Sequence, residues 1–236
     1  MDRYISPYLL KARMYVGRMV KNGHIKSYSQ EGEDMILRRI FEGRKEGFYV
    51  DVGAYHPILY SNTYFFYRLG WRGINIEPNP EYIRLFHKYR TRDINLPAGI
   101  SDVPTDRTYY MFNEPALNTF EENIAKRPTR NEEKYYPIGE TVIKTQLLET
   151  VLQENLPENK NIDFLSVDVE GHEFHVVRSN DWERFRPTCL LVEVLDSNLQ
   201  DIIQSDLHKF MTERSYALYA KTASTIFYLD NRTSRP

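Results

Sequence analysis

The stretch Gly47-Phe-Tyr-Val-Asp-Val-Gly53 combines β-branched and aromatic residues and ends at a glycine. It predicts a short strand that is buried on both faces and followed by a turn. Similar near-continuous apolar runs follow at residues 73–77, 162–169 and 188–194, and a weaker one lies within residues 95–102. Runs of this kind are typical of a parallel sheet that is covered by helices on both sides.

Helical patterns separate these runs, at residues 61–67, 80–89, 146–155 (with Thr145 as the expected N-cap), 172–185 and 199–213. The first three strand ends are 26 and 25 residues apart, which fits one helix plus one strand per repeat. The pattern predicts an α/β doubly wound, mostly parallel sheet with right-handed crossovers. Two closing strands, at 216–219 and 225–229, are too close together for a crossover helix, so we expect them to be antiparallel.

The connection between the third and fourth strands is longer than the others. Asp102 and Asp168 are 66 residues apart, about 40 more than one such repeat needs. The excess, approximately residues 103–145, is polar, tyrosine-rich and interrupted by prolines. We expect an inserted hairpin or lid near the strand carboxyl ends, with a passive surface loop as the alternative.

Charge and cysteine content exclude several classes of protein. The net charge is −2, with 31 Lys and Arg against 33 Asp and Glu, so no nucleic-acid partner is expected. Cys189 is the only cysteine, which excludes a disulfide within the chain and a cysteine-rich zinc site. No run approaches the ~20 apolar residues of a membrane span, and no signal-peptide core is visible, so we expect a cytoplasmic protein.

The first 26 residues form a basic N-terminal arm, distinct from a domain over residues 27–236. The arm carries six Lys or Arg residues against one acid, interleaved with apolar residues. It could form an amphipathic helix that contacts a membrane surface or an acidic partner. Alternatively, it packs on the domain or on a second subunit of a homo-oligomer.

Polar residues follow four successive strands, at the edge where α/β sheets bind ligands. These are Asp51 and Gly53 after the first strand, Glu77 after the second, Ser101 and Asp102 after the third, and Asp168 and Glu170 after the fourth. The glycine-rich loops of dinucleotide-binding and P-loop proteins are absent from the sequence. An acidic edge without a phosphate loop favours a phosphate-free nucleoside with a positive charge, such as S-adenosylmethionine.

Five strings, at residues 27–34, 48–57, 61–67, 70–80 and 164–173, together resemble the FkbM family of S-adenosylmethionine-dependent methyltransferases. The resemblance covers roughly residues 27–195. It implies the seven-stranded, Rossmann-like methyltransferase fold with an antiparallel C-terminal strand. It also implies O-methylation of a hydroxyl, commonly on a sugar or a polyketide.

The resemblance also implies roles for individual residues. Asp51 and Gly53 would lie near the methionine part of the cofactor, although Tyr55 stands where many methyltransferases keep a second glycine. Glu77 would bind the ribose hydroxyls, and Asp168 the amino group of methionine. The remaining cofactor contacts would be Ser101 and Asp102 beside the adenine, and Gln30, Asn62 and Thr63 at the carboxylate or amine.

Transfer of a methyl group to an alcohol requires that the hydroxyl lose its proton. His172 is the first candidate base, because it lies at the expected turn after the fourth strand. Glu170, which flanks it, is also a candidate catalytic residue. His56 is the second candidate base. An alternative that we do not favour is Mg²⁺ held by Asp168, Glu170 and Glu193.

We therefore expect an O-methyltransferase that acts on a sugar, glycan or glycolipid. The aromatic residues of the insertion could stack on sugar rings: Tyr109, Tyr110, Phe112, Tyr135 and Tyr136. Two alternatives stay open. One is a non-catalytic, nucleoside-binding scaffold of the same fold, and the other is a nicotinamide-dependent dehydrogenase or epimerase.

Overall fold

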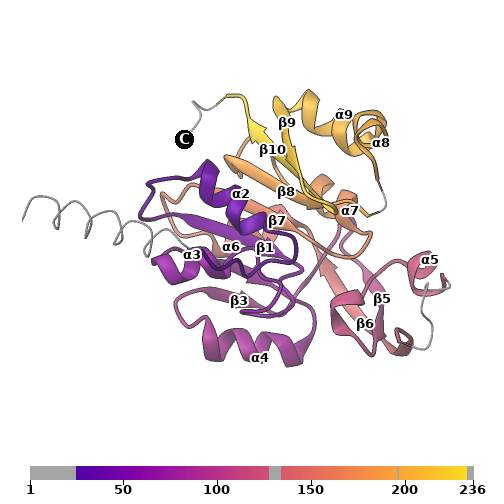
Figure 1. The fold of residues 1–236 in the computed structure, drawn as a ribbon. Helices are drawn as coiled ribbons and strands as arrows, with labels where there is room; N and C mark the ends of the chain where they lie inside the picture. The colour runs from indigo at the N-terminus through magenta and orange to yellow at the C-terminus, as the bar shows by residue number, and fades with distance from the viewer. Residues whose placement is uncertain (1–24, 128–133, 196, 233–236) are drawn as a thin grey trace, which may run out of the picture.

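The computed structural model describes residues 25–127, 134–195 and 197–232 (Figure 1). Its centre is a seven-stranded sheet with the strand order β3-β2-β1-β7-β8-β10-β9. Its strands are β1 (Phe48–Val52), β2 (Arg72–Ile76), β3 (Ile94–Leu96), β7 (Phe164–Val167), β8 (Cys189–Glu193), β9 (Tyr216–Lys221) and β10 (Thr225–Asp230). The first five strands along this order pair in parallel, and β10 is antiparallel to both of its neighbours. The predicted seven-stranded, mostly parallel fold is confirmed.

Side chains along each strand alternate between two cores, one on either face of the sheet. In β1, Val50 and Val52 belong to the larger core, whereas Tyr49 belongs to the smaller one. The larger core includes residues of α6 (Leu148–Asn155), α7 (Glu173–Arg178), α8 (Leu199–Gln204) and α9 (Asp206–Glu213). Helices α2 (Glu33–Ile40) and α3 (Tyr64–Leu69) contribute to the smaller core. Burial on both faces explains why the strand sequences are apolar without alternation.

Helix α4 (Pro80–Tyr89) begins where the sequence predicts it. Pro80 occupies the first turn, where its missing N–H costs nothing. The side chain of Asn79 caps the helix by accepting the Glu81 N–H at 3.0 Å. The helix therefore starts three residues after Glu77. Its first residues hold the short backbone segment that follows Glu77 in place.

The long connection after β3 builds a second, three-stranded sheet with the order β4-β6-β5. Strand β4 (Gly99–Ile100) pairs in parallel with β6 (Pro137–Gln146), and β6 forms a hairpin with β5 (Asp106–Phe112). A short 3-10 helix, η1 (Pro115–Leu117), and α5 (Glu122–Ala125) follow β5. Figure 1 shows this subdomain projecting from the carboxyl edge of the main sheet. We call residues 103–146 the insertion.

Several predicted element boundaries are wrong. The stretch 95–102 divides between two sheets, since β3 joins the large sheet and β4 the small one. Thr145 is not a helix cap: it lies in β6, and its hydroxyl donates to Val103 O at 2.9 Å. The helix expected over 172–185 ends at Arg178, and the one expected over 199–213 is broken at Ser205 into two helices.

Most of the predicted N-terminal arm lies outside the described residues, so its role stays a prediction. Among the residues that the structure describes, no helix is both long enough and apolar enough to cross a bilayer.

Candidate active site

Two neighbouring cavities lie at the carboxyl ends of β1, β2 and β7. Five residues line both of them: Gly53, Tyr55, Ala116, Asp168 and Glu170. We call the cavity that also contains Glu77 the first cavity, and the one that contains Asp51 the second cavity. Ligand sites of α/β sheets occur at this edge, so the position agrees with the prediction.

The first cavity has mostly apolar walls and one buried acid. Ile100 and two aromatic residues of the insertion, Tyr109 and Phe120, line it together with Glu77. The Glu77 carboxylate accepts the backbone N–H groups of Tyr55 at 2.8 Å and Asn79 at 2.7 Å. Burial raises its pKa to about 7, although both hydrogen bonds oppose the shift. A flat apolar group next to hydroxyls would fit here.

The second cavity is polar. Gln30, Asp51 and Asn62, three of the residues expected to contact the cofactor, line it. Asp51 is 4% exposed, and burial raises its pKa to about 6. The amide of Asn62 donates to Ser166 Oγ at 3.1 Å, which ties the segment before α3 to β7. This cavity therefore offers amide and hydroxyl groups beside carboxyl groups, a combination that suits a zwitterion.

Thr63 does not line either cavity, but it contacts the Asp51 carboxylate. Its hydroxyl donates to Asp51 Oδ2 at 3.0 Å and accepts a hydrogen bond from the fully buried guanidinium of Arg90. The Arg90 side chain also pairs with Asp93 at 3.3 Å. Sequence reasoning missed Arg90, because an arginine at a helix end gives no sign that it will be buried.

Gly53 is needed where the two cavities meet. Its φ of 78° is in the left-handed region, and a Cβ there would lie 1.7 Å from the Asp168 carbonyl oxygen. The glycine thus allows the loop after β1 to cross the end of β7. Next to this close contact between Gly53 and Asp168, the residues Asp168 and Glu170 lie on the wall that the two cavities share.

Glu170 projects from a loop that is fixed at several points. Its φ is 54°, and its carbonyl accepts the Thr119 hydroxyl of the insertion at 2.7 Å. The carboxylate of Glu173 accepts the N–H groups of Val169 at 3.1 Å and Gly171 at 2.8 Å. Burial, followed by the charges of Asp168 and Glu173, raises the pKa of Glu170 to about 9. Of the three predicted catalytic residues, Glu170 alone lines the cavities.

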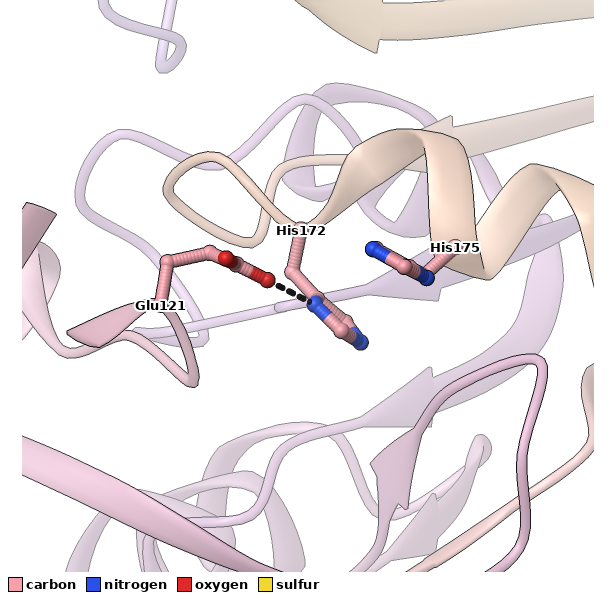
Figure 2. A group of neighbouring side chains, drawn as sticks. All are labelled: Glu121, His172 and His175. Carbon is pink, nitrogen blue, oxygen red and sulfur yellow. Dashed lines mark hydrogen bonds and ion pairs between the residues drawn. The ribbon is translucent and has the colours of Figure 1, made fainter. Parts of the chain in front are cut away.

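His172 is placed differently from the expectation (Figure 2). It is fully buried, and neither cavity is lined by it. Its Nδ1 lies 2.5 Å from the Glu121 carboxylate and its Nε2 3.0 Å from Ser101 Oγ. Since both ring nitrogens are engaged away from the cavities, the structure supports a structural role that joins the insertion to α7.

Glu121, His172 and His175 lie close enough to suggest a metal centre, but the rings oppose it. The two imidazoles stack at 4.4 Å with an interplanar angle of 15°. A metal ion lies in the plane of each imidazole that binds it, and two stacked rings have no shared plane. The arrangement instead joins two hydrogen-bonded pairs, Glu121 with His172 and Asp102 with His175, the latter at 2.8 Å.

The other predicted positions are also occupied by protein contacts. Asp102 binds His175 and Arg178, and Ser101 contacts His172, so neither lines the cavities. His56 Nδ1 accepts the N–H groups of Ile58 at 3.1 Å and Leu59 at 3.0 Å. Because a neutral imidazole has one basic nitrogen, His56 has none left for an acceptor hydroxyl.

Of the five aromatic residues that we expected to stack on sugars, Tyr110 and Tyr135 are half-buried and Tyr136 is 49% exposed, and none of these three lines either cavity. Phe112 is buried at 4% exposure, and Tyr109 is a wall of the first cavity. Outside the insertion, the ring of Tyr60 is 60% exposed, lines the second cavity and stacks on Tyr55 with 6.4 Å between ring centroids. Sequence reasoning missed Tyr60, since an isolated tyrosine in a loop carries no signal of its own.

The sequence of this chain matches the methyltransferase FkbM domain over residues 51–218, which is more than half of its length. The chain belongs to the FkbM methyltransferase family. The matched range begins within β1, at Asp51, and contains β2 and Glu77, as well as the whole insertion and the loop of Glu170. It ends within β9, so β10 and the N-terminal segment with Gln30 lie outside it.

Comparison with curated proteins gave no significant match. Three solved methyltransferase structures each align with a TM-score of 0.41. The C-terminal domain of precorrin-6Y C5,15-methyltransferase from Rhodobacter capsulatus is 12% identical, over 88% of this chain and 90% of that one. A methyltransferase from Geobacter sulfurreducens is 11% identical (98% and 90%). The 1,6-didemethyltoxoflavin-N1-methyltransferase from Burkholderia thailandensis is 9% identical (98% and 92%).

Proposed function

We propose that this FkbM methyltransferase uses S-adenosylmethionine to methylate a hydroxyl group of a sugar or glycan. The supporting observation is the pair of joined cavities. The first has mostly apolar walls around Glu77, the second is polar, and Asp168 and Glu170 lie on the wall that they share. This division matches a molecule with a nucleoside at one end and an amino acid at the other.

The residues of the first cavity fit an adenosine. Each oxygen of Glu77 accepts one backbone N–H, which leaves further lone pairs for the two hydroxyls of a ribose. Tyr109, Phe120 and Ile100 offer apolar surface for a base. Asn118 also lines this cavity and can hydrogen-bond to polar edges of the base.

The residues of the second cavity fit the amino-acid part. The amides of Gln30 and Asn62 can donate to a carboxylate, and Asp51 and Asp168 attract an ammonium group. When bound, S-adenosylmethionine supplies a methyl group on a positively charged sulfur that leaves as a neutral thioether. The unpaired acids of the cavities stabilise that positive charge before the transfer.

In its ionised form, which a pKa of about 9 favours only at alkaline pH, Glu170 would receive the proton of the acceptor hydroxyl. Its carboxyl group lines both cavities, on the wall where they meet. Beside it, the exposed Tyr60 ring offers a face on which a sugar can stack. A sugar that stacks on Tyr60 would bring one of its hydroxyl groups next to Glu170, which would then accept the proton.

A thermal-shift experiment with S-adenosylhomocysteine beside NAD⁺ tests the cofactor. At a hundred times Kd, a bound ligand stabilises the fold by about 2.7 kcal/mol. We expect a shift with the adenosyl compound alone, and a shift with NAD⁺ alone would support the dehydrogenase alternative. Isotopically labelled methyl transfer to a panel of sugars then tests turnover. Binding without transfer to any hydroxyl compound would favour the scaffold alternative.

A further inference from the structure

Three carboxyl groups gather at the ends of β7 and β8: Asp168, Glu170 and Glu193. One oxygen from each lies within 4.8 Å of the other two. Oxygen ligands lie 2.3–2.6 Å from Ca²⁺ and 2.0–2.1 Å from Mg²⁺, so ligands on opposite sides of one ion are about 4–5 Å apart. The three oxygens therefore have the spacing of a divalent-cation shell.

Glu193 gives an independent indication of a missing partner. It is only 8% exposed, its Oε2 atom is inaccessible to solvent, and this oxygen has no hydrogen-bond partner among the described residues. A buried acceptor without a partner costs about 1–3 kcal/mol. The Glu193 side chain does hydrogen-bond to Asp168 within the cluster, but its Oε2 atom gains no partner, and the rest of the strand is apolar.

The cluster also lacks a compensating protein charge. Among the described residues, no lysine, arginine or histidine forms an ion pair with Asp168, Glu170 or Glu193. Burial raises the pKa of each of the three groups. The charge of Asp168 raises the pKa of Glu170 and Glu193 further, whereas a hydrogen bond with Glu193 lowers that of Asp168. A divalent cation would remove this repulsion and supply the partner that Glu193 Oε2 lacks.

We infer that Asp168, Glu170 and Glu193 bind one divalent cation through oxygen. Two of the three ligands line the cavities, so the ion would be accessible to a hydroxyl or water there. The use of that position for an acceptor hydroxyl rests on the proposed function, whereas the binding of the ion does not. A carboxylate that binds through one oxygen keeps its other oxygen, so the site is compatible with proton acceptance by Glu170.

The test is titration of Mn²⁺ into the cofactor-free protein, followed by electron paramagnetic resonance of the free ion. We expect one site, and Glu193→Gln should weaken it at least tenfold. The matched control is Glu158→Gln, which changes an exposed acid with no described partner and should leave the affinity unchanged. Glutamine has the shape of the protonated acid, so Glu193→Gln should unfold at the same or a higher temperature than the wild type without the ion.

Absence of Mn²⁺ binding by the folded wild type would overturn the inference, and so would equal binding by Glu193→Gln. A parallel titration with S-adenosylhomocysteine separates this result from the proposed function. Binding of the adenosyl compound without Mn²⁺ would leave the proposed function standing and would show that the cofactor's own charge serves the cluster. Binding of Mn²⁺ without the adenosyl compound would support the ion site and refute the proposed cofactor.

Discussion

The carboxylate of Glu77, at the end of β2, accepts the backbone N–H of Tyr55 at 2.8 Å. This hydrogen bond connects two adjacent strand ends through the group that we assign to the ribose. The acid is therefore fixed in direction before any ligand binds. Pre-organisation of this kind reduces the entropy that binding must overcome.

We expect Glu77→Gln to raise the Kd for S-adenosylhomocysteine by ten- to a hundredfold. Two charge-assisted hydrogen bonds to ribose hydroxyls would be replaced by weaker neutral ones, at a cost of about 1.5–3 kcal/mol. Isothermal titration calorimetry measures the change. The control is Glu81→Gln, an exposed acid one turn away on α4, which should keep the wild-type affinity. Equal affinity of both variants would contradict the assignment of Glu77.

The pKa of Glu77 near 7 predicts a specific pH dependence of stability in the ligand-free protein. The folded state holds the proton more tightly than the unfolded chain, in which the pKa of a glutamate is about 4.3. The stabilising contribution is therefore complete below about pH 4.3 and is lost as the pH rises through 7. Urea unfolding from pH 5 to 8 should show a falling free energy of unfolding. Glu77→Gln should reduce the total fall in the free energy of unfolding across this range by up to about 3 kcal/mol. An unchanged fall would refute the raised pKa of Glu77.

Thr63→Val should destabilise the fold by about 1–3 kcal/mol, because it leaves Asp51 and Arg90 without their shared hydroxyl partner. Valine keeps the shape of threonine, so the loss reports the hydrogen bonds. Thr63→Ser keeps the hydroxyl and should recover most of the stability. Guanidinium denaturation of the three proteins checks this. If Thr63→Ser were as unstable as Thr63→Val, packing rather than hydrogen bonding would be the cause.

Gly53→Ala should be far more harmful than Gly43→Ala. Both glycines have a φ near 80°, so both substitutions carry the strain of a left-handed residue, about 1 kcal/mol. At Gly43 nothing lies within 4 Å of the new Cβ, whereas at Gly53 the Asp168 carbonyl lies 1.7 Å away. The difference between their melting temperatures isolates the clash. Similar melting temperatures would show that the loop relaxes at little cost.

His172→Gln should lower the free energy of unfolding by about 1–3 kcal/mol while kcat stays within about threefold of the wild type. The reason is that its nitrogens contact Glu121 and Ser101 rather than the cavities. Glu170→Gln should instead reduce kcat severely with little effect on folding. The comparison requires an assay with an accepted sugar substrate. A large loss of kcat in a stable His172→Gln protein would restore the histidine as the base.

The sequence by itself determined the sheet and most of the acids at its edge. Short apolar runs such as 47–53, which end at turn residues and alternate with helical patterns, are typical of buried parallel strands. Following those strands to their ends located Asp51, Glu77, Asp168 and Glu170. Local signals also sufficed for α4, where Asn79 and Pro80 set the start.

Only the tertiary structure decided which way side chains face and what the insertion covers. Asp102, His172 and His56 occupy turns next to the cavities, but contacts with residues distant in sequence, or with nearby backbone, engage their polar atoms elsewhere. Tyr109 and Phe120 reach the first cavity because β5 and β6 form a separate sheet that returns to the carboxyl edge. Such contacts depend on long-range packing, which no local pattern of residues encodes.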